Sequence, residues 1–229
     1  MTETNKFHIR EVCQNPTDGD FIVAAFDSAL PHLASSGSGD QWGSTPFSER
    51  ADYRQRIHDS VPLSEASRLN QEASEHGRLF IAEVETDNGS DLQGLSSRVD
   101  DHGNRFLSVG AAFVRENWWA GYLKAHNSTK PIYENAKTEG TFCYVEMLIS
   151  DFRTGTARKG AGAALLQRAR AYSISRGAKA LYLDCWAGNG GTLVKFYTGQ
   201  GFNKVADFSI ERPDSDGWPG SLLKLELGT

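Results

Sequence analysis

The alternation of apolar and polar positions is clearest at residues 144–150, which read YVEMLIS. Apolar side chains occupy both alternating sets, which is typical of a strand at the centre of a sheet. Successive side chains of a strand point to opposite faces. The sequence therefore predicts a buried central strand with Val145, Met147 and Ile149 on one face.

A loop with three glycines follows this strand and leads into a predicted helix. It contains two adjacent cations, Arg158 and Lys159, beside Gly160 and Gly162. From Ala163 the apolar residues recur at helical spacing. The first N–H groups of a helix have no partner within the helix and lie at the positive end of its dipole. This order of strand, glycine loop and helix predicts a phosphate-binding site.

The same periodicities predict the remaining elements. Strands are expected at 7–12, 79–85, 106–115, 180–186, 205–210 and 222–227. Gly110 either weakens its strand or marks a bulge. Helices are expected from Asp18 to near Pro31, over 48–75 with Pro62 as a candidate break, and after Gly191.

Two segments are interpreted as insertions into a single domain that spans residues 1–229. Residues 86–105 are almost wholly polar, which predicts a solvated insertion between two strands. Residues 117–140 begin with Asn-Trp-Trp and form an aromatic insertion.

Composition narrows the classes of protein. The chain has 229 residues, of which 39% are hydrophobic, and a formal net charge of −5. It has no run of lysines and arginines, so nucleic-acid binding by electrostatics is not expected. The three cysteines are too few and scattered for a disulfide framework or a zinc site, and no metal is expected. Neither an apolar signal core nor a membrane-spanning stretch is present in the sequence, which predicts a cytoplasmic protein.

Two common phosphate loops do not fit the glycine segment. The nucleotide hydrolase motif G-x-x-x-x-G-K-[ST] finds its glycines at 155 and 160, but Ala161 and Gly162 follow where lysine and Ser/Thr are required. The dinucleotide fingerprint G-x-G-x-x-G begins at 160 and is broken by Leu165. The sequence therefore argues against both an ATPase and a dinucleotide-binding domain.

Three motifs in order resemble those of the GNAT acetyltransferase superfamily. The pyrophosphate loop of that family reads Q/R-x-x-G-x-G/A, and residues 157–162 read ARKGAG. Gly160 and Gly162 match the two small positions of the motif. Ala157 stands where the motif has Gln or Arg, and Arg158, one residue later, is the candidate for the role of that side chain. Residues 197–202, YTGQGF, match the Y-x-x-x-G-F ending of the fourth helix, and Asn189 stands near the start of that helix. The resemblance spans roughly residues 105–227.

This resemblance implies a mixed α/β fold with a mainly antiparallel sheet, in which strands four and five, 144–150 and 180–186, splay apart. Acetyl-CoA would lie in the splay as co-substrate, with its pyrophosphate on the glycine loop and its pantetheine paired with strand four. Backbone N–H groups near 148–150 would stabilise the developing oxyanion. The residues expected to bind acetyl-CoA are Leu148, Ile149, Ser150, Arg158, Lys159, Gly160, Ala161, Gly162, Ala163 and Asn189.

The implied reaction is direct attack of an amine on the thioester. Tyr197 matches the family position that protonates the departing thiolate. A phenol, with a pKa near ~10, and an alkyl thiol have similar acidities, so this transfer is expected to cost little. Glu146 is the candidate general base, directly or through water. The alternatives are that Tyr197 only packs its helix and that Glu146 is a satisfied strand carboxylate.

Trp42, Trp118 and Asp184 are the candidates for the acceptor site. Either tryptophan lines a substrate pocket or packs against the core, and Trp118 is also a candidate dimer contact. Asp184 lies on an otherwise apolar strand, where it either orients a cationic acceptor or accepts hydrogen bonds from a neighbouring loop. We expect a small-molecule primary amine as acceptor and a monomer or homodimer. The alternatives are a protein or peptide N-acetyltransferase and a non-catalytic acyl-CoA-binding domain.

Overall fold

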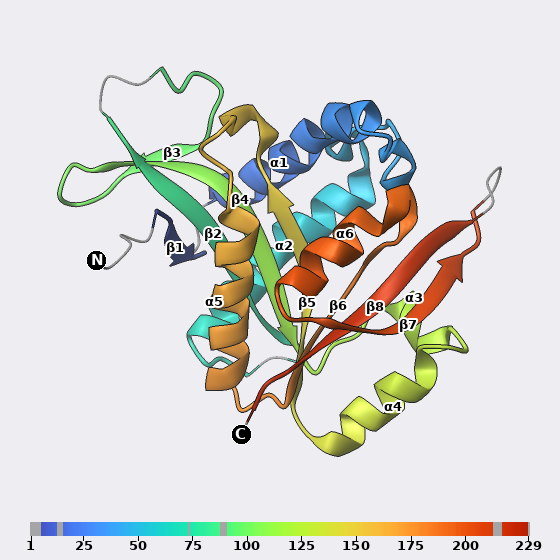
Figure 1. Cartoon of the computed structure of the whole chain (residues 1–229). Coiled ribbons are helices and arrows are strands. Elements are labelled where there is room, and N and C mark those ends of the chain that lie inside the picture. The colour runs from blue at the N-terminus through green and yellow to red at the C-terminus, as the bar shows by residue number, and fades with distance from the viewer. Residues whose placement is uncertain (1–5, 13–15, 73, 88–90, 213–216, 229) are drawn as a thin grey trace.

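The computed structural model describes residues 6–12, 16–72, 74–87, 91–212 and 217–228. Within these residues one mixed sheet runs through the molecule (Figure 1). Its strands lie in the order β1 (His8–Glu11), β2 (His76–Thr86), β4 (Arg105–Glu116), β5 (Phe142–Ser150), β6 (Ala180–Trp186), β8 (Trp218–Glu226) and β7 (Asn203–Ile210). A short strand, β3 (Ser97–Val99), pairs with β4. Among the described strands only β5 and β6 pair in parallel, which confirms the predicted mixed and mainly antiparallel sheet.

Helices cover both faces of this sheet. One face packs against α5 (Ala161–Ser175) and α6 (Gly188–Gly199). The other face packs against α1 (Pro16–Ser35) and α2 (Ala51–Arg68) over one half, and against the segment of α3 (Gly121–Ala125) and α4 (Lys130–Glu139) over the other. Three short turns of 3-10 helix, Gly39–Gln41, Phe47–Glu49 and Phe152–Thr154, complete the elements. No helix among the described residues is long and apolar enough to cross a bilayer.

Strands β5 and β6 pair over a short stretch and then separate. Their ladder consists of Phe142–Tyr144 opposite Ala180–Tyr182. Beyond Tyr144, β5 continues to pair with β4 on its other side, as far as Ser150 opposite Gly110. The inner edges of β5 and β6 are therefore left open to each other, which confirms the predicted splay.

A β-bulge at Glu146 sets which side chains of β5 face which helices. Val145 lies opposite Val114 and Met147 opposite Phe113, so Glu146 is the extra residue of the ladder. Val145 belongs to the cluster beneath α5, whereas Met147 belongs to the cluster beneath α1 and α2. The prediction that these two side chains share a face was wrong, because the extra residue reverses the alternation.

Several predicted boundaries also change. Pro31 and Pro62 lie inside the continuous helices α1 and α2 and end neither of them. Both prolines are exposed, so the carbonyls that lose a backbone partner can turn toward water. Helix α5 begins at Ala161, two residues before the predicted start. At Gly110 the register of β2 and β4 shifts, as a bulge there requires.

The two insertions are more ordered than the sequence suggested. Residues 97–99 form β3, and Arg98 pairs with the buried carboxylate of Glu83 at 2.7 Å. The polar segment is therefore anchored to the sheet and is not wholly solvated, although residues 88–90 lie outside the described part. In the aromatic segment, Trp119 is 1% exposed and packs between Tyr133 and Tyr182.

Candidate active site

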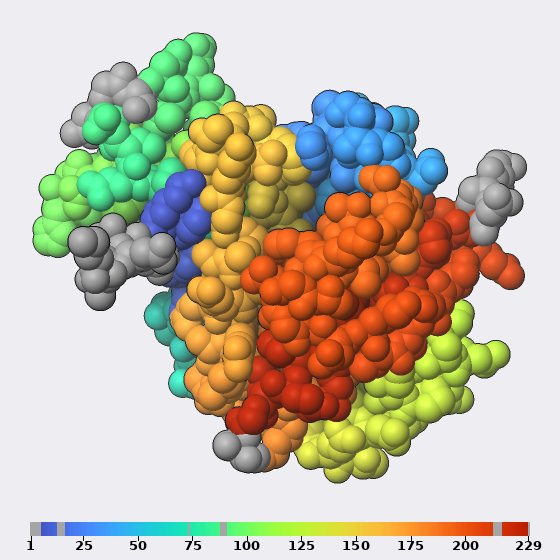
Figure 2. All heavy atoms as spheres, viewed as in Figure 1, coloured from blue at the N-terminus to red at the C-terminus, as the bar shows by residue number. Residues whose placement is uncertain are grey.

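A cavity of about 570 Å³ lies where β5 and β6 separate. Residues of both strands line it, together with residues of α1, α2, α6 and the loop before α5. Figure 2 shows a hollow on this side, between the yellow loop that precedes α5, the orange helix α6 and the blue end of α1. The predicted site residues that line the cavity are Trp42, Glu146, Leu148, Ile149, Ser150, Arg158, Gly162, Asp184 and Tyr197. The fold thus brings together most of the predicted site residues, both those assigned to acetyl-CoA and those assigned to the amine acceptor.

The loop before α5 offers backbone N–H groups to an anion. Gly160 precedes the helix with a φ of +94°, a conformation that residues with a side chain rarely adopt. The N–H groups of Gly162 and Ala163 have no backbone acceptor among the described residues. A Cβ added to Gly162 would first meet Phe196, at 3.4 Å, so the glycine keeps this space open. The loop can therefore hold a phosphate group.

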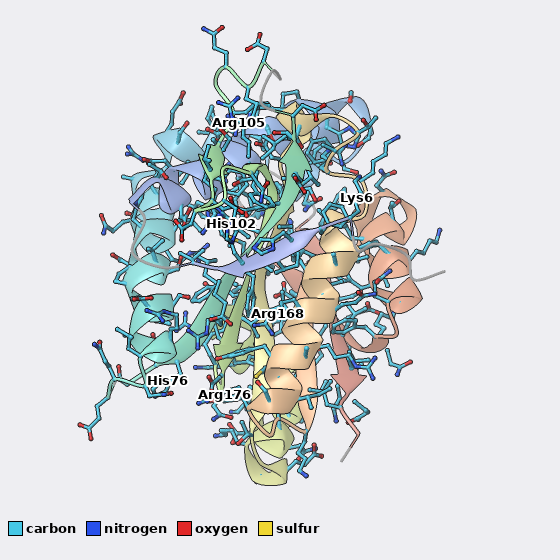
Figure 3. All side chains as sticks on the ribbon, turned by 90° about the vertical axis from the view of Figure 1, so that its left-hand side faces the viewer. Lys6, His76, His102, Arg105, Arg168 and Arg176 are labelled. Atoms are coloured by element: carbon cyan, nitrogen blue, oxygen red, sulfur yellow. The ribbon has the colours of Figure 1, made fainter. Side chains whose placement is uncertain are left out.

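The N-terminal segment contacts the same loop from outside. The amino group of Lys6 donates to the carbonyls of Thr156 and Lys159, at 3.4 and 3.2 Å. The ring of Phe7 lies against Gly160, where an added Cβ would come within 3.2 Å of it. Figure 3 shows Lys6 near the N-terminal end of α5. Lys6 therefore adds a positive charge beside the loop, although sequence analysis did not single it out.

Of the two predicted loop cations, Arg158 is the one that reaches the cavity. Its guanidinium lies 3.6 Å from the centre of the Phe152 ring. Partial burial lowers the pKa of Arg158, which stays charged at neutral pH. Lys159 and Gly160 are exposed on the loop, and neither they nor the buried Ala161 are among the cavity-lining residues.

Asn189 has a structural contact that the sequence did not predict. Its backbone is left-handed, with a φ of +49°. Its amide donates to the carbonyl of Ser36 at 2.9 Å and to the hydroxyl of Ser38 at 2.8 Å. Asn189 therefore ties the start of α6 to the end of α1 and lies outside the cavity lining. Its predicted contact with CoA stays a prediction.

Tyr197 lies on α6 at the cavity, with 8% of its surface exposed. Its hydroxyl has no hydrogen-bond partner among the described residues, so the phenolic proton is available to a substrate. Burial raises the pKa of Tyr197 above its usual value, and the nearby Cys185 and Asp184 act in the same direction. The phenol therefore keeps its proton at neutral pH but is a weaker acid than the sequence argument assumed. Proton donation by this phenol therefore costs more than predicted.

Glu146 is positioned by the bulge and by an arginine on the neighbouring strand. Arg115 on β4 contacts its Oε2 at 2.9 Å and also contacts Glu75 at 2.7 Å. The Glu146 side chain is 12% exposed and lines the cavity. Its Oε1 is left as the oxygen that a substrate amine or a water can approach. The alternative was that Glu146 is a strand carboxylate whose oxygens both have partners. Among the described residues, the structure shows such a partner for Oε2 only.

Asp184 accepts hydrogen bonds from two tyrosines at the cavity wall. Tyr122, at the start of α3, donates to its Oδ2 at 2.8 Å, and Tyr144 on β5 donates to its Oδ1. Burial raises the pKa of Asp184, while the two phenols oppose that shift. The neighbouring hydrogen-bond donor that the sequence left open is Tyr122, which lies in α3 and not in a loop. The carboxylate still lines the cavity, so a role toward a cationic acceptor also stays open.

The two candidate tryptophans differ in position. Trp42 packs against Phe26 and also lines the cavity, so both of its predicted roles are compatible with the structure. Trp118 is not among the cavity-lining residues, and it packs on Tyr144 and the guanidinium of Arg115. The expectation that Trp118 forms a wall of this cavity is therefore not supported.

Sequence reasoning missed several cavity residues. Tyr122 comes from the aromatic insertion, where its polar tip and aromatic ring gave a weak signal. Tyr53 and Arg56 lie on α2, within a segment interpreted only as charged and helical. Tyr53 and Arg56 are three residues apart on α2, a spacing that places them on one face of that helix.

The sequence matches no protein-family model, and a search of curated proteins finds no match. Solved structures do match over nearly the whole chain. One is a protein from Desulfovibrio desulfuricans described as an acetyltransferase of the GNAT family, at 15% identity and a TM-score of 0.55, covering 97% of this chain and 99% of that one. Another is YncA of Salmonella typhimurium, described as an acetyltransferase and solved with its cofactor acetyl-CoA, at 14% identity, a TM-score of 0.52 and coverage of 98% and 95%.

A third match is the NatC complex bound to a Gag peptide and CoA, at 13% identity and a TM-score of 0.50, covering 97% of this chain and 99% of that one. Identities this low are informative about the fold alone. The chain therefore has the GNAT fold, as the three sequence motifs implied.

Proposed function

We propose that the protein is an acetyl-CoA-dependent N-acetyltransferase that acts on a primary amine by direct attack on the thioester. The observation that carries the proposal is the cavity in the splay. The glycine loop lies at one end of it, and Glu146, Asp184 and Tyr197 line it. Phosphate-binding groups and proton-transfer groups thus meet in one space.

CoA would be held by backbone groups more than by side chains. The free N–H groups of Gly162 and Ala163 suit the pyrophosphate, with Arg158 and Lys6 supplying positive charge nearby. The open edge of β5 beyond Tyr144 offers unpaired backbone groups to the amides of the pantetheine arm. In this proposal the thioester lies between β5 and α6.

The reaction requires two proton transfers around one displacement. The amine nitrogen, once neutral, attacks the carbonyl carbon, and the C–S bond breaks as the acetyl group moves to nitrogen. Oε1 of Glu146 is placed to take the proton that the amine loses, directly or through water. Tyr197 is placed to give its phenolic proton to the departing thiolate and to regain one from solvent.

The acceptor is proposed to be a small molecule. Trp42 and Tyr122 line the cavity with aromatic rings, and Asp184 gives its wall a carboxylate that suits an ammonium group. The NatC complex has a similar fold and was solved with a peptide, so the fold alone does not select the acceptor. The preference for a small amine rests on the cavity lining of this chain.

Calorimetry and a thiol assay test the proposal together. Titration with acetyl-CoA should show saturable binding, and a panel of primary amines should include one that releases free CoA thiol only with the enzyme. Binding without turnover across small amines and peptides would favour the non-catalytic alternative. Absence of acetyl-CoA binding would remove the proposal entirely.

A further inference from the structure

We infer that the acceptor carries an anionic group close to its primary amine, so that its amino group lies toward Asp184 and Glu146 while Arg56 receives the anion. This inference rests on the proposed function and names the substrate class of the same cavity. An amino acid is the simplest compound with this pair of charges. A simple alkylamine lacks the anion, and so does a peptide N-terminus whose first residue is not acidic.

The carboxylates of the cavity lie on two neighbouring strands. Glu146 belongs to β5 and Asp184 to β6, and both line the space where those strands separate. Tyr122 and Tyr144 fix the Asp184 carboxylate through two hydrogen bonds, while Arg115 fixes Oε2 of Glu146. The acidic side of the cavity is therefore held in place before a substrate arrives, which favours binding of an ammonium group.

Three arginines line the same cavity, and two of them already have an assignment. Arg50 donates to the carbonyls of Trp42 and Thr45, at 2.8 and 2.6 Å, so its guanidinium fixes the loop that carries Trp42. Arg158 stacks on Phe152 beside the glycine loop, where the phosphates of CoA are expected. Neither guanidinium is free for the acceptor.

Arg56 is the remaining cation, and it has no ion-pair partner among the described residues. It extends from α2 across the ring of Tyr53, 4.9 Å from the ring centre, which orients the guanidinium without neutralising it. Arg56 lines the splay cavity and also an adjoining cavity of about 410 Å³, and Glu146 lines both as well. A cation and a carboxylate thus lie at the junction of the two spaces.

Electrostatics agree with this arrangement. The positive charge of Arg56 and the negative charge of Glu146 both act on the phenol of Tyr122 and on that of Tyr53, in opposite directions. Tyr122 is the residue that donates to Asp184. Arg56 therefore lies within electrostatic reach of the acidic side of the cavity.

Sets of three matched amines test the inference, with each set made of an amino acid, its carboxamide and its decarboxylated amine. Several side chains are used, and kcat/KM is measured by thiol release from about pH 7 to 10, so that differences in amine pKa are separated from recognition. The parent protein should favour the amino acid over its carboxamide by about tenfold or more, since a charge-assisted contact is lost with the carboxylate.

The variant Arg56→Gln should lose this preference through KM, while its rates with the carboxamides and its affinity for acetyl-CoA stay near parental values. Arg54→Gln is the matched control, because Arg54 is exposed on the same helix and lies outside both cavities. A parent protein that acetylates carboxamides or decarboxylated amines as well as amino acids would overturn this inference and leave the proposed function intact. So would an Arg56→Gln variant that keeps the preference. If no amine is acetylated, the proposed function fails and the inference fails with it.

Discussion

Arg115 and Glu146 form an ion pair across the neighbouring strands β4 and β5, with 2.9 Å between Nη1 and Oε2. Arg115 also contacts Glu75, so one guanidinium is shared between an inner and an outer carboxylate. Removing either carboxylate leaves Arg115 with one partner. The pair therefore offers a way to separate the chemical role of Glu146 from its contribution to the local charge balance.

Glu146→Gln should lower kcat/KM at neutral pH by about 10²-fold or more, because it removes the proposed base while keeping the shape of the side chain. The loss should shrink as pH rises, since the amine then deprotonates without help. Glu75→Gln, which removes the other partner of Arg115, should leave the rate near the parental value. An equal loss for Glu146→Gln at every pH would show that Glu146 is not the base.

Tyr197→Phe should lower kcat by about 10²–10⁴-fold with little change in acetyl-CoA affinity, because the ring remains and only the proton donor is lost. Burial raises the pKa of Tyr197, so the parent should keep this advantage into the alkaline range. Tyr172→Phe is the control, since Tyr172 is also buried but donates to Glu116. Parental kcat in the Tyr197→Phe variant would remove the proposed acid.

Gly162→Val should weaken acetyl-CoA binding by at least about tenfold, because the side chain would occupy the space over the free N–H groups of the loop. Gly162 is preferable to Gly160 for this test, since the φ of +94° at Gly160 makes any substitution there strained. Gly199→Val on α6 is the control, because a Cβ at that position meets nothing within 4 Å. Calorimetry that finds unchanged affinity in a folded Gly162→Val protein would exclude the loop as the phosphate site.

Asp184→Asn should change the pH dependence of stability. Burial raises the pKa of Asp184 in the folded protein, so its contribution to stability is fully present below the unfolded value, about 3.9, and is lost as pH rises through the folded value. The free energy of unfolding of Asp184→Asn, relative to the parent, should therefore increase from about pH 4 upward. Urea unfolding at several pH values measures this trend.

Asp207→Asn should show the opposite trend and serves as its control. The amino group of Lys204 and the hydroxyl of Ser221 lower the pKa of Asp207, so its contribution is present above the unfolded value and is lost as pH falls. The effect should be small, because the side chain is largely exposed and screened. Equal trends for the two variants would contradict the assignment for Asp184.

Local patterns in the sequence were enough to predict the site in outline. The order of strand, glycine loop and helix at 144–166 predicted the loop whose N–H groups remain free, and YTGQGF placed Tyr197 on a helix. Both features depend on residues close together in the chain. The prediction that strands 144–150 and 180–186 splay apart is likewise confirmed.

Contacts between distant segments could not be predicted in this way. Tyr122 is 62 residues from Asp184, and Arg115 is 31 residues from Glu146. Each pair depends on strand register and on where an insertion folds back, and neither is encoded by spacing. Pro62 misled the prediction for a different reason. Its position is exposed, so the carbonyl that loses its helical partner can bind water and the helix continues.

The bulge in β5 has a consequence for length variation in this strand. Deleting Glu146 would join Val145 directly to Met147, and these two residues already pair with the consecutive residues Val114 and Phe113 of β4. Met147 and Ile149 would stay on the α1 side of the sheet, and Leu148 would stay on the α5 side with Val145. A one-residue deletion at this point would therefore remove the carboxylate without redirecting the neighbouring side chains, so the strand could lose or gain this residue while both faces of the sheet keep their packing.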